Sequence, residues 1–199
     1  MDLPTIQFKY SPIYDENWKE WIKVYGWKDD VNLTPTQLKE KIIKIERLWK
    51  RYDKDILNEL SKITGLRWQD KTITCYIVGK CRPFSDPLTI PAYKDNNRFI
   101  DVLVHELIHQ LFTQRCNLKK SKEALNYFFT KYKDESRRTI IHIPIHAIHS
   151  HIYLKFFDRK RMENDIEFCK RSAEYEKSWK IVQEEGYQKI IDDFTKRVP

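Results

Sequence analysis

The chain has 199 residues, 41% of them apolar and 33% charged, with only 4 glycines and 8 prolines, which excludes disordered, collagen-like and low-complexity proteins. Its formal net charge is +8, but basic residues alternate with acidic ones in segments such as KIIKIERLWKRYDK, so a nucleic-acid partner is left open without being indicated. No apolar run is long enough to span a membrane, and the first residues contain no basic stretch followed by an apolar one; we therefore expect a soluble, cytoplasmic protein without a membrane partner.

The first third of the chain predicts a strand followed by two helices. Residues 5–10 alternate apolar and polar side chains, which is typical of a short strand. Residues 14–27 are rich in aromatic side chains and favour a short helix that ends at Gly26. The Thr-Pro-Thr-Gln run at residues 34–37 supplies an N-cap, a proline at the first helical position and a capping box. Apolar residues spaced by three and four then predict one long helix that continues to Gly65.

The middle of the chain predicts two strands and a buried helix. Apolar and polar side chains alternate in residues 71–78, which indicates a strand. Residues 84–93 also alternate but contain Pro87 and Pro91. Because proline cannot donate to a strand ladder, we expect this segment to be an edge strand. Residues 98–116 are apolar nearly all round a helical wheel, which is typical of a buried helix.

The last third of the chain predicts helices alone. They cover residues 121–133, 140–157 (starting near Pro144), 160–177 and 178–195. Strands and helices are therefore grouped rather than alternating, which indicates an α+β fold rather than an alternating α/β fold. No repeat and no linker rich in Gly, Ser or Pro divides the chain, so we expect a single domain over residues 1–199.

Cysteine spacing gives no functional signal. The four cysteines are Cys75, Cys81, Cys116 and Cys169. They contain no C-x-x-C pair and no regular spacing, which argues against a zinc ribbon and against a thiol redox motif. We expect buried, reduced thiols.

The histidines give a strong signal, because all six fall between residues 105 and 151. His105, Glu106 and His109 form the pattern H-E-x-x-H inside the predicted buried helix. Residues i and i+4 share one helix face, so both imidazoles can bind a single zinc ion while Glu106 acts as the general base. The composition gives on the order of 0.01 chance matches per chain. The pattern therefore predicts a Zn²⁺ site with Glu106 as its catalytic residue.

A catalytic zinc site needs a third protein ligand. The candidates are His142, His146, His149, Glu123 and Glu135. The three histidines share a helix face, and one of them is the expected ligand, whereas His151 points away from that face. The candidates for stabilising the transition state are His149, His151 and Tyr153.

This combination resembles the zincin metallopeptidases, and within them the gluzincin branch with its small members, the minigluzincins. In that family an edge strand lies over the cleft, an H-E-x-x-H helix follows, and a second helix supplies the third zinc ligand within a stretch similar to N-E-A-I-S-D. Residues 145–150 are similar to this stretch, with His146 at the glutamate position. The resemblance covers residues 71–157 and implies a zincin-like domain in which His105, His109 and His146 bind zinc.

The hypothesis that follows is a zinc-dependent peptidase in which Glu106 takes a proton from a water activated by the metal and later delivers it to the leaving amine. An extended peptide or protein substrate would pair with the edge strand at residues 84–93. Small gluzincins include latent forms, so the resemblance also implies that residues 178–199 could fill the cleft.

Two other functions stay open. One is a catalytically inactive zinc-binding scaffold that acts as a binding or regulatory protein. The other is a metal-dependent nucleic-acid-binding protein, which the net charge of +8 and the clustered histidines motivate.

Overall fold

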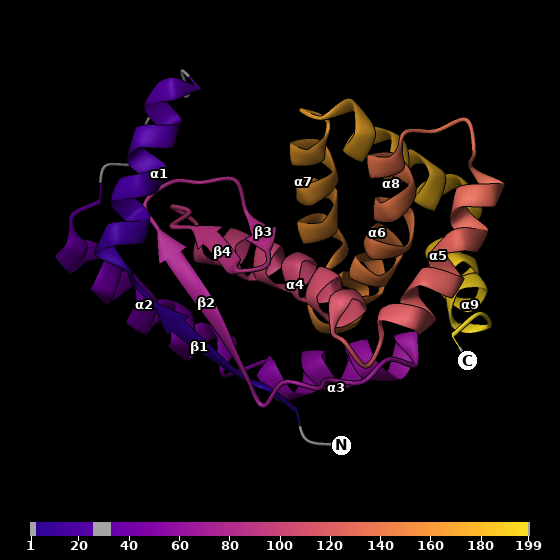
Figure 1. Cartoon of the computed structure of the whole chain (residues 1–199), viewed down its shortest axis with the longest axis horizontal. Coiled ribbons are helices and arrows are strands. Elements are labelled where there is room, and N and C mark those ends of the chain that lie inside the picture. The colour runs from indigo at the N-terminus through magenta and orange to yellow at the C-terminus, as the bar shows by residue number, and fades with distance from the viewer. Residues whose placement is uncertain (1–2, 26–32, 199) are drawn as a thin grey trace. The chain divides into compact units, whose positions relative to one another are not determined.

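The computed structural model describes residues 3–25 and 33–198 (Figure 1). Its helices and its small mixed sheet make it an α+β protein, as the sequence predicts. The chain divides into two compact units. The sheet unit consists of Asp2–Lys54 and Asp70–Gln110, and the helical unit consists of Asp55–Gln69 and Leu111–Pro199.

The sheet unit is built on a four-stranded sheet in the order β1-β2-β4-β3. Its strands are β1 (Thr5–Lys9), β2 (Thr72–Val78), β3 (Phe84–Ser85) and β4 (Leu88–Pro91). β1 and β4 both run parallel to β2, and β3 runs antiparallel to β4. Buried and more exposed side chains alternate along β1 and most of β2, which confirms the strands predicted at residues 5–10 and 71–78.

The single edge strand predicted at residues 84–93 is wrong in detail. The chain turns at Asp86 and Pro87, which are joined by a cis peptide bond, and forms a short hairpin. β4 is buried and pairs with β2, so the edge strand at this end of the sheet is the two-residue strand β3. Periodicity could not separate the two strands, because the turn between them occupies only two residues.

Two helices follow β1, and their N-termini are formed by the caps expected from the sequence. Helix α1 (Pro12–Val24) starts at Ser11, whose hydroxyl accepts the N–H of Tyr14. Helix α2 (Pro35–Trp49) has the predicted capping box between Thr34 and Gln37. The predicted end of the first helix at Gly26 lies outside the described residues.

The long helix predicted up to Gly65 is broken in the structure. α2 ends at Trp49, and helix α3 (Asp53–Thr64) begins after a turn. In that turn the N–H groups of Arg51 and Tyr52 bond to carbonyls three residues back, so the helical ladder is not continued. The apolar stripe runs through the turn without a change of period, which is why the sequence does not reveal it. Gly65 ends α3 as predicted, with φ +70°.

The helical unit is organised around helix α6. Its helices are α3, α5 (Leu118–Lys131), α6 (Arg137–Phe156), α7 (Arg159–Cys169), α8 (Ala173–Glu185) and α9 (Tyr187–Thr195). α6 packs against α5, α7, α8 and α9. The core includes the fully buried side chains of Phe128, Trp179 and Phe194.

Two helix boundaries predicted in this unit are wrong. α6 begins at Arg137, because the Ser136 hydroxyl accepts the N–H of Thr139 and caps the helix; Pro144 lies inside it. Packing on several sides compensates for the one hydrogen bond that this proline removes. Residues 159–195 form three helices rather than two. The helical run breaks after Cys169 and again at Gly186, which adopts φ +86°, and the predicted boundary between residues 177 and 178 lies inside α8.

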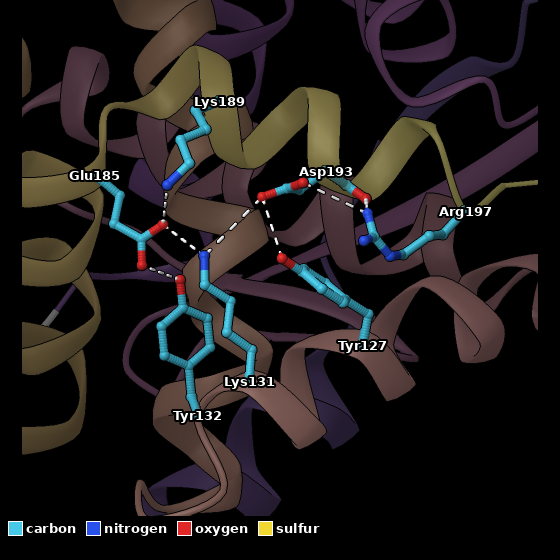
Figure 2. Close-up of polar contacts among 7 residues, drawn as sticks. All are labelled: Tyr127, Lys131, Tyr132, Glu185, Lys189, Asp193 and Arg197. Carbon is cyan, nitrogen blue, oxygen red and sulfur yellow. Dashed lines mark hydrogen bonds and ion pairs between the residues drawn. The ribbon is translucent and has the colours of Figure 1, made fainter.

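A polar network joins α5, α8 and α9 within the helical unit (Figure 2). Glu185 accepts hydrogen bonds from Lys131 at 2.6 Å, Tyr132 at 2.6 Å and Lys189 at 3.1 Å. Arg197 lies over the Tyr127 ring, 3.4 Å from its centroid. Burial alone would raise the pKa of Glu185, but these hydrogen bonds lower it to about 2.

All four cysteines are free thiols. Cys75, Cys81 and Cys169 are buried as expected, but Cys116 is exposed. It lies in the turn between α4 and α5, where its sulfur is 3.5 Å from the Arg67 carbonyl oxygen. Turn residues face solvent more often than helix or strand residues do, which explains the difference.

Candidate metal centre

Helix α4 (Asn96–Thr113) carries the H-E-x-x-H pattern. Nearly all its apolar side chains are buried, which confirms the predicted buried helix. Phe99 near its start contacts Phe8 of β1, with ring centroids 6.1 Å apart. His105 and His109 are half-buried one turn apart, with ring centroids 5.1 Å apart. The helix therefore brings the two predicted zinc ligands together on one face.

Glu106 lies between these histidines in the sequence and is 6% exposed. Burial raises the pKa of its carboxyl to about 8. Burial, and after it the charge of Glu106, raises the pKa of the Cys75 thiol on β2. Burial, then Cys75 and then Glu106 raise the pKa of the Cys81 thiol. These two cysteines stay protonated near neutral pH, so neither supplies a thiolate.

Gln110 ties α4 to the edge of the sheet. Its side-chain amide donates a hydrogen bond to the carbonyl oxygen of Ser85 in β3. This contact fixes the edge strand against the last turns of the helix that carries His105 and His109. Neither spacing nor composition marks Gln110, because its partner is a backbone carbonyl elsewhere in the chain.

His142 on α6 is held in one tautomer. Its Nδ1 lies 2.7 Å from the carbonyl oxygen of Arg138, which can only accept, so Nδ1 carries the proton and Nε2 the lone pair. Burial lowers the pKa of His142 to about 4, and the imidazole is therefore neutral near pH 7. Its ring contacts Tyr175, with centroids 4.4 Å apart. A neutral imidazole oriented through Nδ1 has the form that metal-binding histidines take.

His146, the ligand implied by the family resemblance, is enclosed within the helical unit. Its Nδ1 lies 2.8 Å from the hydroxyl oxygen of Ser178, which itself donates to the Tyr175 carbonyl, so the histidine donates to the serine. The ring stacks on Trp179 at 4.4 Å between centroids, with 12° between the planes. Ser178 and Trp179 lie on α8, and no local sequence signal connects them with His146.

His149 lies next along the same helix. Its Nδ1 is 3.8 Å from a carboxylate oxygen of Asp165 on α7, and its ring stacks on Tyr153 with centroids 4.3 Å apart. Both rings are buried. The thiol of Cys169 also points to Asp165, at 3.8 Å.

The remaining candidates have structural surroundings. His151 lies 2.7 Å from Glu59, which Lys155 also contacts at 2.6 Å, as expected for a histidine that faces away from the others. Glu123 is exposed on α5. Glu135 forms an ion pair with Lys177 at 3.0 Å. These surroundings do not favour either glutamate as a metal ligand.

The donor set fits zinc by its chemistry. His105 and His109 offer two imidazoles from one turn of α4, and α6 offers imidazoles whose tautomers are fixed by hydrogen bonds. Comparisons with protein-family models, curated proteins and solved structures found no match to this chain. In the described residues, no helix is long and apolar enough to cross a membrane.

Proposed function

We propose that the protein is a zinc-dependent peptidase whose ligands are His105, His109 and His142. The observation that carries the proposal is the pair of histidines one turn apart on the buried helix α4, with Glu106 between them in the sequence. Two imidazoles on one helix face can bind a single metal ion, and a carboxyl group beside them can act on a water that the metal activates.

For the third ligand we prefer His142 to His146. His142 already has the tautomer a ligand needs. His146 is more enclosed, at 1% exposure, with one face of its ring on Trp179.

A bound zinc ion supplies Lewis acidity, which polarises a carbonyl group and makes water acidic. Glu106 accepts a proton from the attacking water and delivers it to the leaving amine. An extended peptide would add its backbone to the edge of the sheet at β3, where Gln110 anchors the Ser85 carbonyl. Peptide is therefore the favoured substrate class.

The metal is tested by elemental analysis of protein purified without chelator or added zinc. We expect about one zinc per chain in the wild type, and its loss in His105→Ala, His109→Ala and His142→Ala. His146→Gln and His151→Gln are the matched controls and should keep the metal. A folded wild type without zinc, or zinc retained in His105→Ala, would overturn the proposal.

Catalysis is tested with Glu106→Gln on a mixture of unstructured peptides. The variant should keep its zinc and lose about 10²-fold or more of the hydrolysis rate. Full activity in this variant would exclude Glu106 as the base. A wild type that binds zinc and cleaves no peptide would instead identify a zinc-binding scaffold.

A further inference from the structure

Helix α1 has three distinct faces. Asp15 and Ile22 are buried on the first, where the Asp15 carboxylate accepts the N–H of Gly79 at 2.6 Å. The second face is charged and consists of Glu16, Lys19, Glu20 and Lys23. The third is exposed and carries the apolar residues Ile13, Trp21, Val24 and Tyr25, the last being the C-cap residue, together with the polar Asn17. A helix that only covers a sheet needs one buried face, so the exposed apolar residues of the third face require another explanation.

The third face is well exposed. Ile13 is 78% and Val24 80% exposed, and Trp21 and Tyr25 stack on each other with ring centroids 5.5 Å apart. Exposed apolar side chains gathered on one helix face mark an interaction site more often than single exposed apolar residues do.

We propose that this face binds α1 of a second copy of the chain in antiparallel orientation. The charged face beside it supplies the reason. Read forwards, Glu16, Lys19, Glu20 and Lys23 have the signs minus, plus, minus, plus; read backwards, every sign is opposite. Two antiparallel copies centred between Lys19 and Glu20 therefore place Glu16 of one copy opposite Lys23 of the other, and Lys19 opposite Glu20.

The same centre, between Lys19 and Glu20, also brings the apolar residues of the two copies to similar levels along the helices. With a rise of about 1.5 Å per residue, Trp21 lies about 2 Å along the helix from the two-fold axis, and Ile13 of one copy lies within about 3 Å of the levels of Val24 and Tyr25 of the other. One helix face per copy is smaller than a standard interface of about 1,200–2,000 Å², so the association is weak and depends on concentration.

Sedimentation velocity over a range of protein concentrations tests the surface. The wild type should shift from monomer toward dimer as the concentration rises, and Val24→Glu should stay monomeric. Ile43→Glu on α2 is the matched control, because it adds the same charge at another exposed apolar residue. A monomeric wild type at every concentration overturns the proposal. If its tryptophan emission then changes with phosphatidylcholine vesicles, the face belongs to a lipid surface.

Charge reversal tests the orientation. Glu16→Lys and Lys23→Glu should each weaken self-association at least several-fold, whereas an equimolar mixture of the two variants should associate like the wild type. Within one helix Glu16 pairs with Lys19 and Glu20 with Lys23, both at 2.7 Å, and mixing cannot repair these pairs. Recovery in the mixture therefore has to come from contacts between copies. Two variants that associate no better together than alone would exclude the antiparallel arrangement.

Discussion

Glu106 shows that one carboxyl group can be unfavourable for folding and still essential for the proposed chemistry. The group is buried, and burial holds its pKa near 8, so the folded metal-free protein keeps it protonated at neutral pH. The unfolded chain ionises at its ordinary pKa, and this difference favours unfolding as the pH rises.

Glu106→Gln should therefore stabilise the metal-free protein above the ordinary carboxyl pKa. A group whose pKa is raised on folding contributes stability at low pH that is lost as the pH rises through about 8. The difference in unfolding free energy between variant and wild type should grow from near zero at low pH to at most about 5 kcal/mol. Urea unfolding with chelator at several pH values measures it. Glu123→Gln, at an exposed glutamate, should show no such trend, and a gap that does not change with pH would contradict the argument.

At the scale of residues, the sequence predicts three of the four residues of the candidate site. His105, Glu106 and His109 follow from spacing alone, since a helix face is a local property. The third ligand does not follow from spacing, because His142, His146 and His149 share one helix face. They differ only in the groups that their ring nitrogens contact. Those groups are the Arg138 carbonyl, Ser178 on α8 and Asp165 on α7.

At the scale of elements, most helices and strands were predictable while several of their ends were not. Helix ends that the residue type itself marks are predicted correctly, as at the N-cap Thr34 and at Gly65. Ends that depend on backbone hydrogen bonds or packing were missed, as in the turn before Asp53 and in the buried helix that contains Pro144.

Gly186→Ala should destabilise the protein by about 1–3 kcal/mol. The cost is conformational rather than steric, because an added Cβ would meet no atom within 4 Å while φ stays at +86°. Gly79→Ala is the matched control: φ is not positive there, and the nearest atom to its Cβ is an Asp15 oxygen at 3.4 Å. Thermal unfolding of both variants measures the difference. Equal losses would show that φ at Gly186 is not the cause.

The network around Glu185 predicts a stabilisation that depends on pH. A carboxyl whose pKa is lowered to about 2 contributes stability above its ordinary pKa, and this contribution is lost as the pH falls toward 2. Because the side chain is 22% exposed, we expect Glu185→Gln to cost about 1–2 kcal/mol near neutral pH and little at about pH 2. Chemical unfolding at both pH values measures the loss. Glu184→Gln, at a neighbouring and exposed glutamate, should change stability at neither.

At the scale of the whole molecule, no change in amino-acid composition marks the division into two units. The boundaries fall in the first turn of α3, just before β2 and inside α4, rather than in flexible linkers. An absence of Gly-, Ser- or Pro-rich segments therefore could not reveal them, and the expectation of a single domain remains a prediction.

The C-terminal residues are core elements of the helical unit. The resemblance to small gluzincins implied that residues 178–199 could act as an inhibitory segment, but α8 and α9 bury Trp179, Ile190 and Phe194. Each such side chain contributes about 2–3 kcal/mol, so losing all three removes much of a typical domain's stability. Truncation after Lys177 should abolish cooperative unfolding, measured by calorimetry. A truncated protein with a sharp transition and raised peptidase activity would restore the inhibitory role.

The parallel pairing of β1 with β2 bears on how the chain is synthesised. Thr5 pairs with Thr72, so β1 leaves the ribosome before α1, α2 and α3, and its neighbour in the sheet follows only after them. Closing so long a loop is slow compared with forming the helices within it. Until β2 is made, β1 has no strand to pair with and the apolar side chains of Ile6 and Phe8 stay exposed. β1 is therefore a segment that a chaperone would protect during translation.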